Sequence, residues 1–311
     1  MKHVIALDVG GTGMKAALVA ADGTLLHEAR RPTGRERGPD AVVEAVLDFA
    51  ADLRAEGEKR FGVPAVAAGV AVPGVVDEKN GVAVYASNLG WDRVPFRDLL
   101  GHRLGGEGGV PVALGHDVRC GGLAEGRIGA ARGIERYFFL ALGTGIAGAI
   151  GIEGRIESGA NGASGEIGHI QIRPNGPQCG CGALGCLESV ASASAVARAW
   201  SASGGGPGAS AADAARAVEA GDPDAAAVWQ YMVDALADGI VTGLRLLDPS
   251  TFVIGGGLAE AGDTLFEPLR RAVAERARFQ APPALVPARL GDTAGCLGAG
   301  LLAWDLHGAG H

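Results

Sequence analysis

The sequence predicts an α/β protein built from two copies of one β-loop-β unit. A buried strand at residues 3–8, a glycine-rich loop and a second strand at 15–20 form the first copy. A strand at 136–142, a Gly-Thr-Gly loop and a strand at 146–152 repeat this order. Strand and helix patterns alternate along the rest of the chain, as they do in α/β proteins. We therefore expect a duplicated fold with a ligand between its halves.

The other elements follow from hydrophobic spacing and from the residues that end each run. The further predicted strands are 24–30, 65–72, 112–115, 251–254 and 284–287. The predicted helices are 40–60, 118–128, 190–203, 210–220, 223–247, 263–279 and 294–306. Pro73-Gly74 ends one strand and Asp248-Pro249 ends the longest helix, because neither pair continues a regular element.

Composition and charge narrow the class of protein. The 311 residues suffice for two domains, and 48% hydrophobic with 20% charged residues is typical of a globular chain. The net charge of −8 argues against a nucleic-acid or anionic-membrane surface. MKHVIALDVGG meets Asp8 too early for a signal peptide, and no apolar run reaches the ~18 residues that span a membrane. Three of the five cysteines cluster, which leaves Cys120 and Cys296 as buried thiols and favours a reducing cytoplasm.

The stretch GEIGHIQIRPNGPQCGCGALGCLE, residues 165–188, contains a candidate metal site. Its four candidate ligands are His169, Cys179, Cys181 and Cys186. A closed Cys3His set is typical of structural Zn²⁺, because thiolate and imidazole suit zinc and no position stays open for chemistry. The alternative is a redox pair or a group of unrelated buried cysteines. The predicted zinc would fix the loop that carries Glu166 and Glu188.

Three glycine-rich loops are candidate phosphate and nucleotide sites. They are Asp8-x-Gly10-Gly11-Thr12-x-x-Lys15, Gly143-Thr144-Gly145 and Gly255-Gly256-Gly257. Backbone N–H groups in such loops can approach phosphate oxygens, and the threonine hydroxyl adds a donor. Asp8, at a strand end, can hold Mg²⁺ directly or through water. The first loop is neither a P-loop nor a Rossmann fingerprint, since GxxxxGK[ST] is absent and no helix follows the glycines. An ordinary hairpin turn is the alternative for the first loop, and a plain β-to-α turn is the alternative for the third.

Asp117 is the candidate general base. It follows a short strand and precedes a helix, so its carboxylate can accept a proton from an attacking hydroxyl. The alternative is a helix N-cap, which Asp favours. Asn88, Glu166, His169 and Glu188 form a further polar set that suits a polyhydroxylated ligand, because each sugar hydroxyl both donates and accepts. Solvated surface charge is the alternative for the two glutamates.

These motifs together resemble the ROK family (repressor, open reading frame, kinase), and within it the bacterial glucokinases. GEIGH followed by CGCGALGCLE is the most specific part, and DVGGTGMK, VPGVVD, LGTGI and IGGGL match further motifs in the family's order. The resemblance covers essentially the whole chain. It implies a two-domain actin-like (ribonuclease H-like) ATPase fold with ATP and sugar in the cleft. We expect a small domain over 1–117, completed by a helix at 294–311, and a large domain with the zinc loop over 118–293.

The resemblance also implies a role for each motif. Asp117 is implied to take the proton from the 6-hydroxyl of a hexose, whose oxygen then attacks the γ-phosphate of ATP in line. The implied sugar-contacting residues are Gly74, Asn88, Glu166, His169 and Glu188, and the implied nucleotide-contacting residues are Gly11, Thr12, Thr144 and Gly256. The family usually has Asn-Asp where this chain has His116-Asp117. His116 therefore stands at a sugar-contacting position and bears on the preference among hexoses.

Three functions remain open at this stage. The expected one is an ATP-dependent hexose kinase that makes glucose 6-phosphate. A kinase for fructose, mannose or N-acetylmannosamine fits the same motifs, and polyphosphate is a lesser alternative to ATP. The third is a sugar-sensing regulator without catalysis. ROK repressors carry an N-terminal helix-turn-helix, whereas this chain begins at its first strand, so DNA binding is not expected. Family members are commonly dimers or tetramers, which implies a homo-oligomer.

Overall fold

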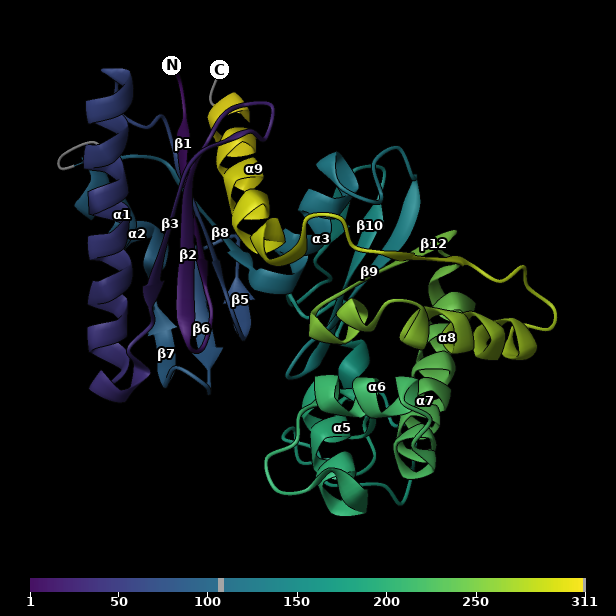
Figure 1. Ribbon diagram of the computed structural model, residues 1–311. Helices are drawn as coiled ribbons and strands as arrows, with labels where there is room; N and C mark the ends of the chain where they lie inside the picture. The colour runs from purple at the N-terminus through teal and green to yellow at the C-terminus, as the bar shows by residue number, and fades with distance from the viewer. Residues whose placement is uncertain (106–108, 310–311) are drawn as a thin grey trace. The chain divides into compact units, whose positions relative to one another are not determined.

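A computed structural model describes residues 1–105 and 109–309 (Figure 1). The chain divides into two compact units. Unit 1 comprises Met1–Ile128, Ser158–Ala163 and Asp292–His311, and unit 2 comprises Gly129–Glu157 and Ser164–Gly291. Unit 1 extends beyond the expected boundary at 117, because α3 (Asp117–Ile128) packs against α9 (Ala294–Ala309). The end of the expected helix 294–311, residues 310 and 311, lies outside the described residues.

Unit 1 is organised around a five-stranded mixed sheet. Its strands in spatial order are β3 (Leu25–Pro32), β2 (Gly13–Val19), β1 (Val4–Val9), β4 (Ala68–Val72) and β8 (Val112–His116). The first three strands are antiparallel neighbours, whereas β1, β4 and β8 run parallel. Helix α1 (Pro39–Phe61) lies on one face of this sheet and α9 on the other (Figure 1). The parallel strands are almost wholly buried because both faces are covered.

A smaller sheet and one helix of unit 1 were not expected from the sequence. The sheet joins β5 (Val75–Asp77), β6 (Val82–Ala86) and β7 (Trp91–Val94), and the helix is α2 (Phe96–Gly105). Buried Trp91 packs edge-on against Phe96 with ring centroids 4.9 Å apart, which fastens β7 to α2. A single turn, η1 (Arg35–Arg37), precedes α1.

Unit 2 contains a second five-stranded sheet with the topology of the first. Its strands in spatial order are β11 (Arg155–Glu157), β10 (Ile146–Ile152), β9 (Arg136–Leu142), β12 (Thr251–Gly255) and β13 (Ala284–Pro287). Again the first three strands are antiparallel neighbours and the last three run parallel. This repeated topology agrees with the repeat of the β-loop-β unit in the sequence.

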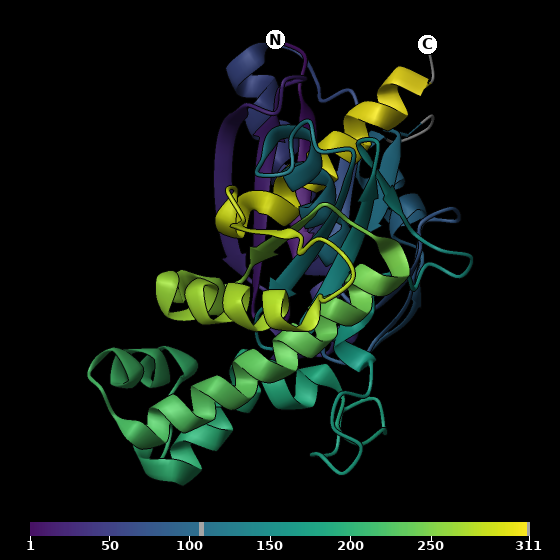
Figure 2. The same ribbon diagram turned by 90° about the vertical axis from the view of Figure 1, so that its right-hand side faces the viewer.

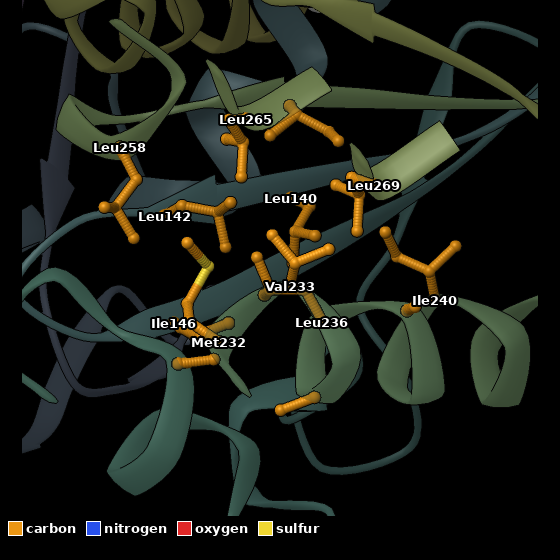
Figure 3. Close-up of a cluster of buried hydrophobic side chains, with 14 of the residues drawn as sticks. Leu140, Leu142, Ile146, Met232, Val233, Leu236, Ile240, Leu258, Leu265 and Leu269 are labelled. Carbon is orange, nitrogen blue, oxygen red and sulfur yellow. The ribbon is translucent and has the colours of Figure 1, made fainter. Parts of the chain in front are cut away.

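The core of unit 2 lies between its sheet and two long helices. Helices α7 (Pro223–Leu247) and α8 (Asp263–Arg276) run side by side (Figure 2). Leucines of β9 meet Val233 and Leu236 of α7 in this core (Figure 3). Asp222 caps α7, because its side chain accepts hydrogen bonds from the N–H groups of Asp224 and Ala225.

Short helices complete unit 2. They are η2 (Ile167–His169), α4 (Leu187–Ala191), α5 (Ala193–Trp200), η3 (Ser201–Gly205), α6 (Ala211–Glu219) and η4 (Gly257–Ala261), while η5 (Gly291–Thr293) leads back toward α9. The prediction of one continuous helix over 190–203 is therefore wrong, because α4, α5 and η3 occupy this stretch. Ser192 divides it, because its hydroxyl accepts a hydrogen bond from the Ala195 N–H at 3.1 Å and starts α5 anew. Among the described residues, no helix is long and apolar enough to cross a membrane.

Candidate functional site

The parallel strands of unit 1 bring several predicted site residues to one edge of the sheet. Asp8 lies near the carboxyl end of β1, Gly74 follows β4, and His116 and Asp117 lie at the end of β8. Because these strands are parallel neighbours, their carboxyl ends meet at the same edge, where α/β sheets bind ligands. The structure thus places the candidate base beside the candidate Mg²⁺ ligand.

The Asp117 carboxylate is held by a hydrogen bond but remains partly exposed. Its Oδ1 accepts a hydrogen bond from the Val118 N–H at 2.7 Å, yet 32% of the side chain stays exposed. Burial raises the pKa of Asp117 to about 6, against the lowering effects of the Val118 N–H and of Arg119. His116 is only 8% exposed, and its Nδ1 lies 3.3 Å from Asp117 Oδ1. At neutral pH this carboxylate is ionised and reachable, as a general base must be.

Asp8 has the electrostatics of a cation ligand. Burial, and to a smaller extent the Asp117 carboxylate, raise its pKa to about 7, although Lys15 has the opposite effect. Two neighbouring carboxylates that resist ionisation gain stability when a divalent cation binds near them. The donor set at this edge therefore fits Mg²⁺, with Asp8 as its expected holder.

Hydrogen bonds from Thr33 fix the first glycine-rich loop. The Gly10 N–H donates to Gly13 O at 2.9 Å, and the Thr33 hydroxyl donates to Gly10 O at 2.7 Å. The Thr33 N–H donates to Thr12 O at 3.1 Å. A methyl group at Gly11 would lie 3.2 Å from Asn88 Nδ2, so the candidate sugar ligand stands beside the phosphate loop. The sequence contains no signal for the role of Thr33, because no motif connects a buried threonine directly after β3 with this loop.

Lys15 has a partner that the sequence did not suggest. Its Nζ donates to the Asp292 carbonyl oxygen at 2.6 Å and lies 3.5 Å from Asp292 Oδ2. Arg30 Nη1 donates to the same carboxylate oxygen at 2.8 Å. These contacts hold the segment that enters α9, which gives Lys15 a structural role beside the predicted nucleotide role.

Unit 2 places two glycine loops and Glu188 together. Gly143-Thr144-Gly145 follows β9 and Gly255-Gly256-Gly257 follows β12, and these strands are parallel neighbours. Gly256 has φ of +86°, and a side chain there would overlap the carbonyl of Leu142. Glu188 Oε2 accepts a hydrogen bond from the Ile146 N–H at 2.8 Å, and a side chain at Gly145 would overlap that carboxylate. Thr144 is exposed at the tip of its loop.

The GEIGH motif lies directly against β10. Gly165 has φ of +89°, and a side chain at Gly165 or Gly168 would overlap backbone carbonyls of β10. This close approach supports η2, whose two ends carry Glu166 and His169 with exposed side chains. The motif therefore presents a carboxylate and an imidazole from one short turn.

The four predicted metal ligands form one cluster. The candidate ligand atoms of His169, Cys179, Cys181 and Cys186 all lie within 4.8 Å of one another. Cys179 Sγ lies 3.6 Å from His169 Nδ1, and Cys181 Sγ lies 3.7 Å from Cys186 Sγ. Tetrahedral Zn²⁺ with ordinary bond lengths separates two sulfurs by about 3.8 Å, and a sulfur and a nitrogen by about 3.6 Å. The residues therefore fit zinc in size, number and chemistry.

The thiols of this cluster have opposed pKa shifts. Burial, together with the hydrogen-bonded neighbours Cys181 and Cys179, raises the pKa of Cys186 to about 12. The Ala183 N–H lowers the pKa of exposed Cys181. A bound dication would favour the thiolate form of all three cysteines, as metal sites of this kind require.

Comparisons with known proteins agree with these motifs. The family model described as "ROK family" matches residues 4–305. A glucokinase from Thermotoga maritima is 34% identical, with 95% of each chain covered. An N-acetylmannosamine kinase from Citrobacter koseri is 30% identical over 96% of this chain and 98% of its own length. A ROK family glucokinase from Streptomyces griseus, solved with glucose and AMPPNP, superposes with a TM-score of 0.82 at 28% identity, covering 97% of this chain and 99% of that one.

The family model spans nearly the whole chain, and the relatives align over almost their full lengths. On these grounds the chain belongs to the ROK family.

Proposed function

We propose that this ROK protein is a sugar kinase that transfers the γ-phosphoryl group of ATP to the 6-hydroxyl of a hexose, with glucose as its preferred substrate. The observation that carries the proposal is Asp117, an accessible carboxylate with a pKa of about 6 beside Asp8. The glycine-rich loop after β1 lies at the same edge of the sheet. The glucokinase relatives support this choice of reaction and of sugar.

In the proposed mechanism, Asp117 removes the proton of the 6-hydroxyl as the oxygen attacks phosphorus. The leaving ADP takes the electrons of the broken P–O bond, and the proton resides on the Asp117 carboxyl. Mg²⁺ held near Asp8 would neutralise charge on the phosphate oxygens. Positioning and charge stabilisation supply most of the rate in such transfers.

Glycine-rich loops of both units are the proposed nucleotide ligands. The proposed nucleotide ligands are Asp8, Gly10, Gly11, Thr12, Lys15, Gly143, Thr144, Gly145, Gly255, Gly256 and Gly257. The fixed loop after β1 and the exposed Thr144 support this set, since rigid backbone N–H groups and a hydroxyl donor suit phosphate oxygens. ATP rather than polyphosphate is the proposed donor, because the three glycines after β12 allow a base or ribose to lie close to the backbone.

The sugar would be held by hydrogen bonds from donors and acceptors of several kinds. The proposed ligands are Gly74, Asn88, His116, Asp117, Glu166, His169 and Glu188. His116 is the residue that bears on sugar preference, because an imidazole stands where the family usually has an amide. The N-acetylmannosamine kinase relative supports that sugar as a second candidate, and fructose and mannose are further candidates because they fit the same motifs.

The metal cluster is proposed to bind structural Zn²⁺. It connects to the nucleotide loop through α4, since Cys186 immediately precedes the helix that carries Glu188. Thiolate ligands must stay reduced, which favours the cytoplasm. We further propose an actin-like duplication, supported by the repeated strand order of the two sheets, and a homo-oligomer, supported by the family match alone.

A substrate analogue tests the position of transfer. We expect 6-deoxyglucose to compete with glucose, because it keeps the other hydroxyls, and to release no ADP above background. Glucose itself should yield glucose 6-phosphate, which a glucose-6-phosphate dehydrogenase detects. ADP release from 6-deoxyglucose at the rate of glucose would overturn transfer to the 6-hydroxyl.

A further inference from the structure

Arg119 is a buried arginine two residues after the proposed base. Only 4% of its side chain is exposed. Its Nε donates to Glu78 Oε1 at 2.9 Å, and its Nη1 donates to the carbonyl oxygen of Gly162 at 2.8 Å. Its Nη2 is buried and has no hydrogen-bond partner among the described residues. An incompletely paired guanidinium costs stability, and an apolar side chain of the same size would avoid this cost.

The guanidinium joins three segments of unit 1. Arg119 belongs to the first turn of α3, Glu78 follows β5, and Gly162 belongs to the segment Ser158–Ala163. Gly162 has φ of +69°, and a side chain there would lie 2.8 Å from the carbonyl oxygen of Val76. The segment therefore runs against β5, and Arg119 fastens both to the start of α3.

Arg119 is also the cation in a group of carboxylates. Burial raises the pKa of the adjacent Cys120 thiol, and Glu78, Asp8 and Asp117 raise it further, whereas Arg119 opposes them. These carboxylates therefore act electrostatically on the first turn of α3. Arg119 lowers the pKa of Asp117 against the larger effect of burial. Among the described residues, the ionisable groups near Asp117 include His116 and Arg119 on its own segment and Asp8 on β1.

We propose that Arg119 is a positioning residue for Asp117: its guanidinium fixes the first turn of α3 against the β5 turn and the 158–163 segment, and it places a positive charge in the same helical turn as the base. This inference rests on the proposed role of Asp117. It differs from a purely structural ion pair. Such a pair would contribute to stability, but the loss of its positive or its negative partner would not shift the pKa of Asp117 in opposite directions.

Two substitutions that break the same ion pair test the proposal. Arg119→Met removes the positive charge and keeps the aliphatic volume, whereas Glu78→Gln removes a negative charge and keeps an acceptor for Arg119. A base with a pKa of about 6 gives a ratio of kcat/KM at pH 8 to that at pH 5.5 of about 4 in the wild type. We expect the ratio to exceed about 10 in Arg119→Met and to fall toward about 2 in Glu78→Gln. The kcat of Arg119→Met at pH 8 should fall about tenfold, with KM for Mg-ATP changed less than about twofold.

Matched variants separate charge, geometry and general damage. Arg119→Lys keeps the positive charge but loses the planar guanidinium that contacts Glu78 and Gly162 at once. The ratio of kcat/KM at pH 8 to that at pH 5.5 should therefore stay near the wild-type value, while kcat falls. Arg127→Met breaks the bidentate pair with Asp305 at the other end of α3, and should leave ratio and kcat unchanged. Shifts of the same sign in Arg119→Met and Glu78→Gln, or an unchanged ratio in Arg119→Met, would overturn the proposal.

A readout without turnover keeps this test independent of the proposed reaction. The side-chain carboxyl of Asp117 can be titrated by carbon-13 NMR in aspartate-labelled protein and assigned by its loss in Asp117→Asn. We expect the midpoint to rise in Arg119→Met and to fall in Glu78→Gln. A wild type that releases no ADP with any sugar contradicts the proposed function, whereas midpoints that do not move contradict the role of Arg119.

Discussion

Replacing Asp117 with Asn removes the proposed base and changes little else. The amide keeps the size of the side chain, and its oxygen can still accept the hydrogen bond from the Val118 N–H, which spans 2.7 Å in the wild type. The fold should therefore persist. Loss of a general base typically lowers the rate by about 10²- to 10⁴-fold, and we expect kcat/KM to fall within this range.

The pH profile of the wild type follows from the same carboxyl. Burial raises the pKa of Asp117 to about 6, so the group protonates and activity is lost as the pH falls through this value. The ionised fraction is about 97% at pH 7.5 and about 9% at pH 5, which predicts about a tenfold fall in kcat/KM. The Asn variant should lack this acid limb.

The assay is coupled ADP release at low sugar concentration and saturating Mg-ATP, from pH 5 to pH 8.5. Circular dichroism and thermal melting should show that the variant is folded. Asp8 and His116 also lie near Asp117, so the comparison with Asp117→Asn is what assigns the limb. Turnover near the wild-type level, or an acid limb that survives the substitution, would refute Asp117 as the base.

Three further substitutions test other parts of the structure. Cys179→Ser should lose bound zinc, measured by elemental analysis, and melt earlier, because a metal bound only by the folded state stabilises it. Gly145→Ala should lower kcat/KM for Mg-ATP by about tenfold, since the methyl group displaces the Glu188 carboxylate that holds this loop. Gly298→Ala should lower the free energy of unfolding by about 1–3 kcal/mol, measured by urea titration, because its methyl group overlaps the Cys120 carbonyl between α9 and α3.

Open positions of the same chain serve as controls. A methyl group at Gly180 or Gly308 would meet nothing within 4 Å, so these Ala variants should keep zinc and stability respectively. A Cys179→Ser protein with full zinc content and unchanged melting contradicts the metal site. Wild-type kinetics in Gly145→Ala, or wild-type stability in Gly298→Ala, would show that the packing there is looser than the structure indicates.

Long apolar runs made much of the fold predictable. The strands expected at 136–142, 146–152 and 284–287 have those bounds as β9, β10 and β13, and the helix expected at 223–247 is α7. Each is ended by glycine, proline or a charged turn, so the hydrophobic periodicity and the structure-breaking residues predict the same bounds. The family motifs likewise identified the ROK family, which the match over residues 4–305 shows.

Short elements and distant contacts were not predictable in this way. Strand β5 has three residues and only one of them is buried, so it carries no periodic signal. Lys15 meets Asp292, 277 positions later, and local spacing contains no information on such pairs. Arg119 belongs to no motif, and its importance comes from Glu78 and Gly162, which reach it only in the folded unit.

The most direct test of the central claim is a coupled assay for ADP release, with Mg-ATP and a panel of glucose, fructose, mannose and N-acetylmannosamine. The proposed function predicts saturable turnover with the highest kcat/KM for glucose. A clear preference for another sugar would contradict glucose as the substrate and point to His116, whereas no turnover with any sugar from folded, zinc-loaded protein would contradict the kinase itself.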